Sequence, residues 1–140
     1  MSSLDTRDDR PAIGADVEVR IPADLSQLFV LRSIAATLAL REDFDLDEVE
    51  DVKLAVDEMC SALVLRARRG ALLTCRFDAL PRSVGVVASV GSDDPEPIPK
   101  DTFGWRVLAA LTDELTSWTT AGESSGREMH IKMTKTRAPG

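Results

Sequence analysis

The segment from Asp45 to Arg69 constrains the fold most, because it predicts a long helix with a strong start signal. Asp45 can accept hydrogen bonds from the free backbone N–H groups of the first turn, and Glu48 can reach back to the backbone of Asp45. Gly70 then predicts the end of the helix. Apolar residues recur at helical spacing along one side, which must face a core: Val49, Val52, Val56, Met59, Cys60, Leu63 and Ala67.

The opposite side of this helix is unusual because it carries Glu58 among Leu54, Ala62 and Leu65. A carboxylate among apolar neighbours is typical of a lined groove or pocket. The alternative is a solvated glutamate beside exposed leucines, and scattered exposed apolar residues are common on protein surfaces. The spacing alone favours this alternative, so the pocket needs further support.

Composition predicts one domain in a soluble, cytoplasmic protein. The chain has 140 residues, of which 44% are hydrophobic, so it can bury a real core. It lacks an apolar run near the ~20 residues of a membrane span, and its N-terminus is acidic, unlike a signal peptide. These features predict no membrane partner.

The formal charge of −7 argues against a nucleic-acid partner, because phosphate contacts need clustered Lys and Arg. Arg66, Arg68 and Arg69 form the one tight basic cluster, and we expect them to cap the end of the long helix, where cations complement its dipole. The charge favours protein partners with basic patches.

Two cysteines and one histidine provide neither a disulfide framework nor a metal site. Cys60 and Cys75 are predicted to be small apolar core residues. His130 alternates with Met129 and Ile131 as in a strand, so we expect it to face solvent. This arrangement argues against nucleophilic catalysis.

The pattern of elements predicts an α+β, two-layer sandwich: a mixed, mostly antiparallel sheet of about five strands covered on one face by three helices. Residues 1–15 are predicted to be a flexible acidic tail, 16–135 the single domain and 136–140 a short tail. The expected strands are 17–21, 73–77, 84–90, 115–120 and 127–134, and the other helices are 25–40, capped by Asp24, and one from about Thr102. Residues 91–101 form a proline-rich acidic loop.

Two motifs resemble a known family, the RsbW-type anti-sigma factors of the GHKL group of ATP-binding proteins. Residues 54–64, LAVDEMCSALV, resemble the family's signature helix, and residues 102–108, TFGWRVL, resemble its second glycine box, particularly in the actinobacterial, UsfX-like branch. The likeness covers nearly all of residues 16–135, so the resemblance implies a GHKL (Bergerat-like) fold.

The resemblance implies that the chain binds an RNA polymerase sigma factor. It implies less strongly the ATP-dependent kinase activity by which many members phosphorylate an anti-anti-sigma protein. In the family, a Glu of the signature helix is the general base and an Asn four residues later holds Mg²⁺. Glu58 matches this catalytic glutamate, but Ala62 occupies the Asn position. Alanine offers no oxygen ligand, so the motif predicts no metal site and weak ATP and Mg²⁺ binding at most.

The glycine boxes that would contact the nucleotide are also depleted. Gly91 is the one glycine in the region of the first box, and Gly104 is the one that remains in the second. Gly104 could meet an anion at a helix N-terminus, or could serve close packing there. The loop between the boxes contains Pro95, Pro97 and Pro99, which lack the N–H groups of a phosphate cradle.

Arg32 matches an arginine of the family's first helix that meets both the sigma factor and the anti-anti-sigma protein. An exposed arginine on an amphipathic helix is often merely solvated. In a shared partner groove, its planar group could instead pair bidentately with a carboxylate.

Three hypotheses remain open. The leading one is an anti-sigma factor, implied to be a homodimer, that sequesters a stress-type sigma factor and is released by an anti-anti-sigma (STAS-type) protein. The second is an active Mg-ATP-dependent serine/threonine kinase of that anti-anti-sigma protein, with Glu58 as base. The third is an interaction domain that has kept the scaffold and changed its partner.

Overall fold

The computed structural model describes residues 16–122 and 126–139. The predicted flexible tail, residues 1–15, lies outside the described residues. Within the described part of the chain, no helix is long and apolar enough to cross a membrane.

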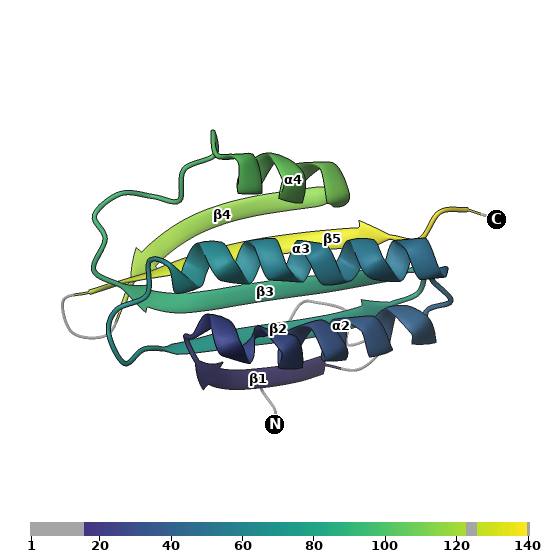
Figure 1. The fold of residues 1–140 in the computed structure, drawn as a ribbon, viewed down its shortest axis with the longest axis horizontal. Helices are drawn as coiled ribbons and strands as arrows, with labels where there is room; N and C mark the ends of the chain where they lie inside the picture. Colours follow the sequence, from purple (N-terminus) through teal and green to yellow (C-terminus); the bar gives the residue numbers. More distant parts are fainter. Residues whose placement is uncertain (1–15, 123–125, 140) are drawn as a thin grey trace, which may run out of the picture.

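Five strands form one sheet in the order β1-β2-β3-β5-β4 (Figure 1). Every pair of neighbouring strands is antiparallel, so the predicted sheet is confirmed without a parallel pair. β2 and β3 form a hairpin joined by Pro81 and Arg82, as the sequence predicted. The strands are β1 (Asp16–Pro22), β2 (Leu72–Leu80), β3 (Ser83–Ser92), β4 (Glu114–Ala121) and β5 (Arg127–Thr136).

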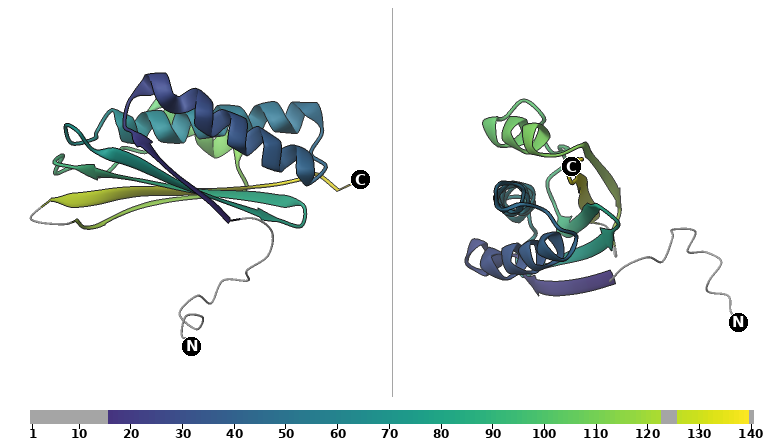
Figure 2. Two further views of the ribbon diagram at one scale, coloured as in Figure 1. Left: turned by 90° about the horizontal axis from the view of Figure 1, so that it is seen from below. Right: turned by 90° about the vertical axis from the view of Figure 1, so that its right-hand side faces the viewer.

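Helices α2 (Leu28–Arg41), α3 (Leu46–Val64) and α4 (Phe103–Leu111) lie on one face of the sheet (Figure 2). The prediction of a two-layer α+β sandwich is therefore confirmed. Asp24 caps a short 3₁₀ turn, η1 (Leu25–Gln27), through the backbone N–H of Ser26, and the α-helix follows it. The other face of the sheet carries no helix in the described part of the chain (Figure 2).

α3 is the central helix and starts as predicted. The Asp45 carboxylate accepts from the backbone N–H of Glu48, and the Glu48 carboxylate accepts from that of Asp45, forming a complete capping box. The predicted core side is buried from Val49 to Leu63. Between sheet and helices, the core also contains the strand residues Phe77, Val86 and Ile131, and both cysteines.

The end of α3 differs from the prediction, because the helix stops at Val64 instead of continuing to Arg69. The backbone N–H of Arg68 donates to the carbonyl of Gly91, which draws this segment toward the end of β3. Of the arginine cluster, Arg66 does cap the helix by donating to the carbonyl of Ala62, whereas Arg68 pairs with Asp93. Gly70 has a φ of +79° and shapes the turn into β2.

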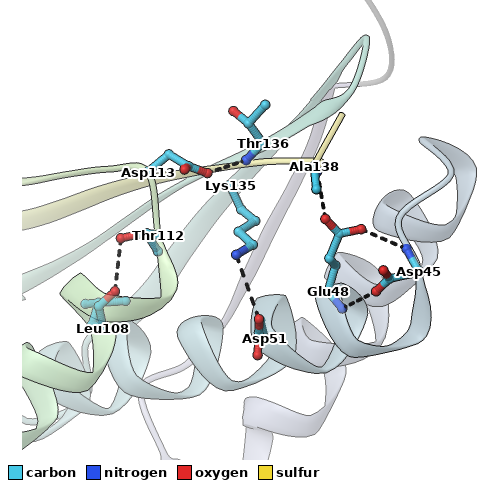
Figure 3. Close-up of polar contacts among 9 residues, drawn as sticks. All are labelled: Asp45, Glu48, Asp51, Leu108, Thr112, Asp113, Lys135, Thr136 and Ala138. Carbon is cyan, nitrogen blue, oxygen red and sulfur yellow. Dashed lines mark hydrogen bonds and ion pairs between the residues drawn. The ribbon is translucent and has the colours of Figure 1, made fainter. Parts of the chain in front are cut away.

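The start of α3 is also joined to the end of the chain's last strand (Figure 3). The Glu48 carboxylate accepts a second backbone hydrogen bond, from Ala138 at 2.7 Å, and Asp51 pairs with Lys135 at 3.8 Å. The Asp113 carboxylate accepts from the backbone N–H of Thr136. The Glu48 and Asp51 contacts hold residues 135–138 against the start of α3, and the Asp113 contact holds Thr136 beside the start of β4.

Candidate functional site

A cavity of about 230 Å³ lies between the C-terminal half of α3, the start of α4 and the loop that precedes α4. Glu58, Ala62 and Leu65 line it, so the structure brings together three of the four residues that made the outer side of α3 unusual. Leu54 is not among the lining residues. The remaining lining residues are Ser61, Arg66, Ile98, Pro99, Thr102, Gly104, Trp105 and Leu108.

Glu58 and Gly104 meet at this cavity although they are far apart in sequence. A Cβ atom added to Gly104 would lie 2.7 Å from Oε1 of Glu58, so the absence of a side chain lets the carboxylate approach the start of α4. Thr102 caps this helix by accepting from the backbone N–H of Trp105 at 3.1 Å. A carboxylate at a helix N-terminus is electrostatically favourable and leaves less room there for a phosphate.

Magnesium does not fit the residues of this cavity. Ala62, one turn after Glu58, contributes only a methyl group, whereas Mg²⁺ requires several oxygen ligands. Among the described residues, no group of three or more His, Cys, Asp or Glu side chains could hold a metal ion. The site therefore offers a single carboxylate.

The cavity walls are mainly apolar, and two cations in or near them make other contacts. Arg66 donates to the carbonyl of Ala62 at 3.0 Å, and Lys100 lies over the ring of Trp105, 5.7 Å from its centroid. Ile98 and Pro99 of the predicted proline-rich loop form one wall. At about 230 Å³ the cavity is also below the ~300–1,000 Å³ typical of ligand pockets.

Gly91, predicted at the nucleotide site, lies at the end of β3 and is not a lining residue of the cavity. Its carbonyl accepts from the backbone N–H of Arg68, and a Cβ there would lie 2.7 Å from the Arg68 guanidinium. The absence of a side chain at Gly91 therefore allows Arg68 to pack closely against the end of β3. Sequence order had placed it in a glycine box, but only the packing shows which segment it faces.

Arg32 lies on α2 and forms an ion pair with Asp57 of α3, with 2.7 Å between Nη1 and Oδ1. The side chains keep 36% and 31% of their exposure, so the pair remains accessible. Phe29, one turn before Arg32, and Leu54, one turn before Asp57, are both exposed. Sequence reasoning missed Asp57, although it is next to Glu58 in the signature helix.

His130 is not solvated as predicted, because its side chain is only 13% exposed. It lies on the helix-free face between two hydroxyl groups, with Ser89 at 2.6 Å from Nδ1 and Thr120 at 2.8 Å from Nε2. The ring also stacks on Trp118, with 5.0 Å between centroids. Burial lowers the pKa of His130, and the Glu128 charge opposes that shift.

Cys60 and Cys75 are both buried, as predicted, and their sulfur atoms lie 3.8 Å apart. The hydrogen bond to Cys75 and burial both raise the pKa of the Cys60 thiol. A protonated, buried thiol is a poor nucleophile, which is consistent with a packing role.

Comparison with known proteins gives a relative that matches along most of the chain. The anti-sigma-F factor RsbW of Mycobacterium tuberculosis is 35% identical over 114 residues, which are 81% of this chain and 67% of the relative. The chain belongs to the family of RsbW-type anti-sigma factors. The antiparallel sheet covered by three helices is consistent with the GHKL superfamily. No family model matches the chain.

Shorter matches connect this RsbW-type chain to relatives named as enzymes. The serine-protein kinase RsbW of Bacillus cereus is 35% identical over 51 residues, 36% of this chain and 32% of the relative. The serine-protein kinase RsbW of Bacillus thuringiensis matches to the same extent. The long match is thus to a relative named as an anti-sigma factor, and the short ones are to relatives named as kinases.

Proposed function

We propose that this protein is an anti-sigma factor that binds a stress-type RNA polymerase sigma factor without needing a nucleotide, and that an anti-anti-sigma protein of the STAS type releases it. The long match to a protein named anti-sigma-F factor carries the proposal. Such a role requires a cytoplasmic protein, and the family implies a homodimer.

The Arg32 region supports a partner surface on α2 and α3. The Arg32–Asp57 pair lies between Phe29, which is 56% exposed, and Leu54, which is 44% exposed. A charged pair flanked by exposed apolar side chains is typical of an interface centre, where arginine and aromatic residues contribute most of the binding energy. A partner carboxylate could replace Asp57 on the planar guanidinium.

The composition of the cavity supports the nucleotide-independent part of the proposal. Ala62 supplies no ligand for Mg²⁺, and the Glu58 carboxylate already lies beside Gly104 at the start of α4. Phosphoryl transfer depends on cations that neutralise the charge on the phosphates. Without such cations no phosphoryl group is transferred, and Glu58 has no reaction in which to act as general base.

Calorimetric titration of the purified chain with a stress-type sigma factor tests the partner, and a parallel titration with Mg-ATP tests the nucleotide. We expect sigma binding that is unchanged by Mg-ATP, and no heat from Mg-ATP itself. Absence of binding to every sigma factor of the source genome would refute the role.

The Arg32→Ala variant locates the contact. If Arg32 is an interface anchor worth about 2 kcal/mol, its loss weakens sigma binding by roughly 30-fold. Arg41→Ala, at the other end of the same helix, is the matched control and should leave the affinity unchanged. Equal effects of the two variants would show a general charge effect.

The kinase alternative rests on Glu58 and Gly104 meeting at the cavity. Incubation with labelled ATP and the cognate anti-anti-sigma protein distinguishes it from the binding role. Label on a serine or threonine that is lost in Glu58→Ala would establish a kinase. If neither the wild type nor Glu58→Ala transfers label to the anti-anti-sigma protein, the result supports a nucleotide-independent inhibitor.

A further inference from the structure

Two neighbouring carboxylates of α3 differ in whether the protein supplies them with a cation. Asp57 pairs with Arg32 of α2, with 2.7 Å between the charged atoms. Glu58, the next residue, lines the cavity, and no residue in the described ranges 16–122 and 126–139 forms a hydrogen bond or an ion pair with it. A carboxylate that borders an apolar space without a protein partner is electrostatically uncompensated. The Glu58 cavity therefore favours a ligand that brings a positive charge.

One oxygen of this carboxylate is left for a ligand. Oε1 lies 2.7 Å from the position that a Cβ on Gly104 would occupy, beside the start of α4, whereas Oε2 is more than 4 Å from that position. Oε1 thus lies near the helix N-terminus, where a negative charge is favourable. Oε2 is available to accept a hydrogen bond from an ammonium or guanidinium group, and such charge-assisted bonds are about twice as strong as neutral ones.

The walls of the cavity suit an apolar stem behind the charged group. Leu65, Ile98 and Pro99 present hydrocarbon, and Trp105 presents an aromatic ring. The Lys100 ammonium lies over this ring, 5.7 Å from its centroid, so the ring already attracts one cation. With a volume of about 230 Å³, below the ~300–1,000 Å³ of pockets for drug-sized ligands, the cavity accepts a stem of fragment size.

The charges around the cavity disfavour an anionic ligand. From residue 94 onward, the loop before α4 carries three acids and one base: Asp94, Glu96, Asp101 and Lys100. Arg66 is the one basic residue among the described lining residues, and its guanidinium donates to the carbonyl of Ala62. It follows Glu58 by more than two helical turns, or about 12 Å along a helix, and forms no ion pair with it.

We propose that the Glu58 cavity binds a small organic cation: a primary ammonium or guanidinium group held by Glu58, on an apolar or aromatic stem held against Trp105 and the loop. Two sources carry this chemistry, a free organic amine and a Lys or Arg side chain of a bound protein partner. The cavity is separate from the Arg32 contact, so the inference goes beyond the proposed function and does not rest on it.

NMR titration of the full chain with three probes of similar size and different charge tests the site: phenethylammonium, neutral 2-phenylethanol and anionic phenylacetate. We expect phenethylammonium to shift the indole N–H signal of Trp105 and to bind roughly tenfold or more tightly than 2-phenylethanol, the gain of a hydrogen bond to a charged group. Phenylacetate should bind most weakly. Equal affinities for the three probes, or shifts only at Trp118, which lines a different cavity, would overturn the proposal.

Three variants separate charge from shape. Glu58→Gln keeps the side-chain size and removes the charge, so it should abolish the preference for phenethylammonium over 2-phenylethanol. Glu50→Gln, at an exposed position of the same helix, is the matched control and should keep that preference. Ala62→Leu fills the cavity and should weaken the binding of all three probes. A preference that survives Glu58→Gln, or undiminished binding by Ala62→Leu, contradicts a Glu58 contact in this cavity.

Competition with the sigma factor identifies the source of the cation. If phenethylammonium weakens sigma binding by the wild type and not by Glu58→Gln, the cavity receives a basic side chain of the sigma factor. If it binds without changing the sigma affinity, the ligand is a free amine. Either outcome supports the site.

The two proposals fail separately. Absence of sigma binding leaves the probe titrations unaffected, and absence of probe binding leaves the sigma contact at Arg32 standing.

Discussion

The two ends of α3 differ in what surrounds them. At the N-terminal end, the Asp45–Glu48 capping box and the contacts of Glu48 with Ala138 and of Asp51 with Lys135 attach the helix to the rest of the chain. At the C-terminal half, Glu58 and Ala62 border the cavity, and Asp57 pairs with the accessible Arg32. One helix is therefore anchored at its start and presents chemical groups near its end.

The comparison also shows why the outer side of α3 tolerates apolar residues. The polar contacts near the N-terminal end, with the buried side, hold the helix in place. We therefore expect the outer side chains of the C-terminal half, which face away from the core, to vary with little cost to folding. We expect substitutions to affect folding according to whether they lie on the core side, at the anchored start or beside the cavity.

The largest effect is expected on the core side. Leu63 is fully buried, so Leu63→Ala should lower the free energy of unfolding by about 2–5 kcal/mol, through lost burial and the cavity left behind. Leu65→Ala is the matched control, because Leu65 is 71% exposed, and should change stability by less than about 0.5 kcal/mol. Urea unfolding of both variants measures the difference, and similar losses would contradict the division between the two sides.

The second-largest effect on stability is expected at the start of α3. Asp45→Ala removes the side chain that accepts from the backbone N–H of Glu48 and should cost about 0.5–2 kcal/mol. Asp47→Ala, in the first turn but outside the capping box, serves as control for the loss of a charge near the helix dipole. A cap effect no larger than the control effect would mean that the tertiary contacts alone fix this end.

The anchored end should also be sensitive to acid. Backbone hydrogen bonds from Ala138 and Asp45 lower the pKa of Glu48 below its ordinary value of 4.5, and the charge of Lys135 adds to this. Since the folded pKa is the lower one, the contribution of Glu48 to stability is present above about pH 4.5 and is lost as pH falls through the folded pKa.

Urea midpoints measured from pH 6 to pH 3 check this dependence. Glu48→Gln should remove the Glu48 part of the decline, so the difference in midpoint between wild type and variant should shrink toward acid. A difference that stays constant over this range would show that the carboxylate charge is not involved.

The smallest effect is expected at the cavity. A Cβ at Gly104 would meet the end of the flexible Glu58 side chain, which can move aside, while alanine favours a helix over glycine by up to about 1 kcal/mol. Gly104→Ala should therefore leave stability unchanged or slightly higher and displace the Glu58 carboxylate. Thermal unfolding and a crystal structure of the variant check both parts, and a loss of more than about 1 kcal/mol would show that Glu58 is rigidly held.

Local signals in the sequence were sufficient for most of the elements. The capping residues Asp45 and Thr102 mark helix starts because a side chain and nearby backbone N–H groups satisfy each other within a few residues. Alternation of apolar residues likewise identified β2 and β3, since each strand has one buried face. Helix caps and alternating strand patterns can be predicted because they depend on residues that are close together in the sequence.

Two predictions were wrong at positions where contacts between distant segments decide the structure. α3 ends early because the Arg68 backbone bonds to Gly91, which the arginine cluster by itself could not reveal. His130 is covered because Trp118 and Ser89 come from other strands. The sequence also offered no sign that Arg32 pairs with Asp57 of the neighbouring helix.

The sequence by itself determined the class of fold and the core side of α3, because both follow from residue type and spacing. Only the tertiary structure decided that Glu58 lies beside Gly104, that Gly91 packs against Arg68 and does not line the cavity, and that β4 is an edge strand of the sheet. These outcomes depend on how helices and strands distant in sequence pack together, and the spacing of residues along one segment carries no information about which distant segment it will face.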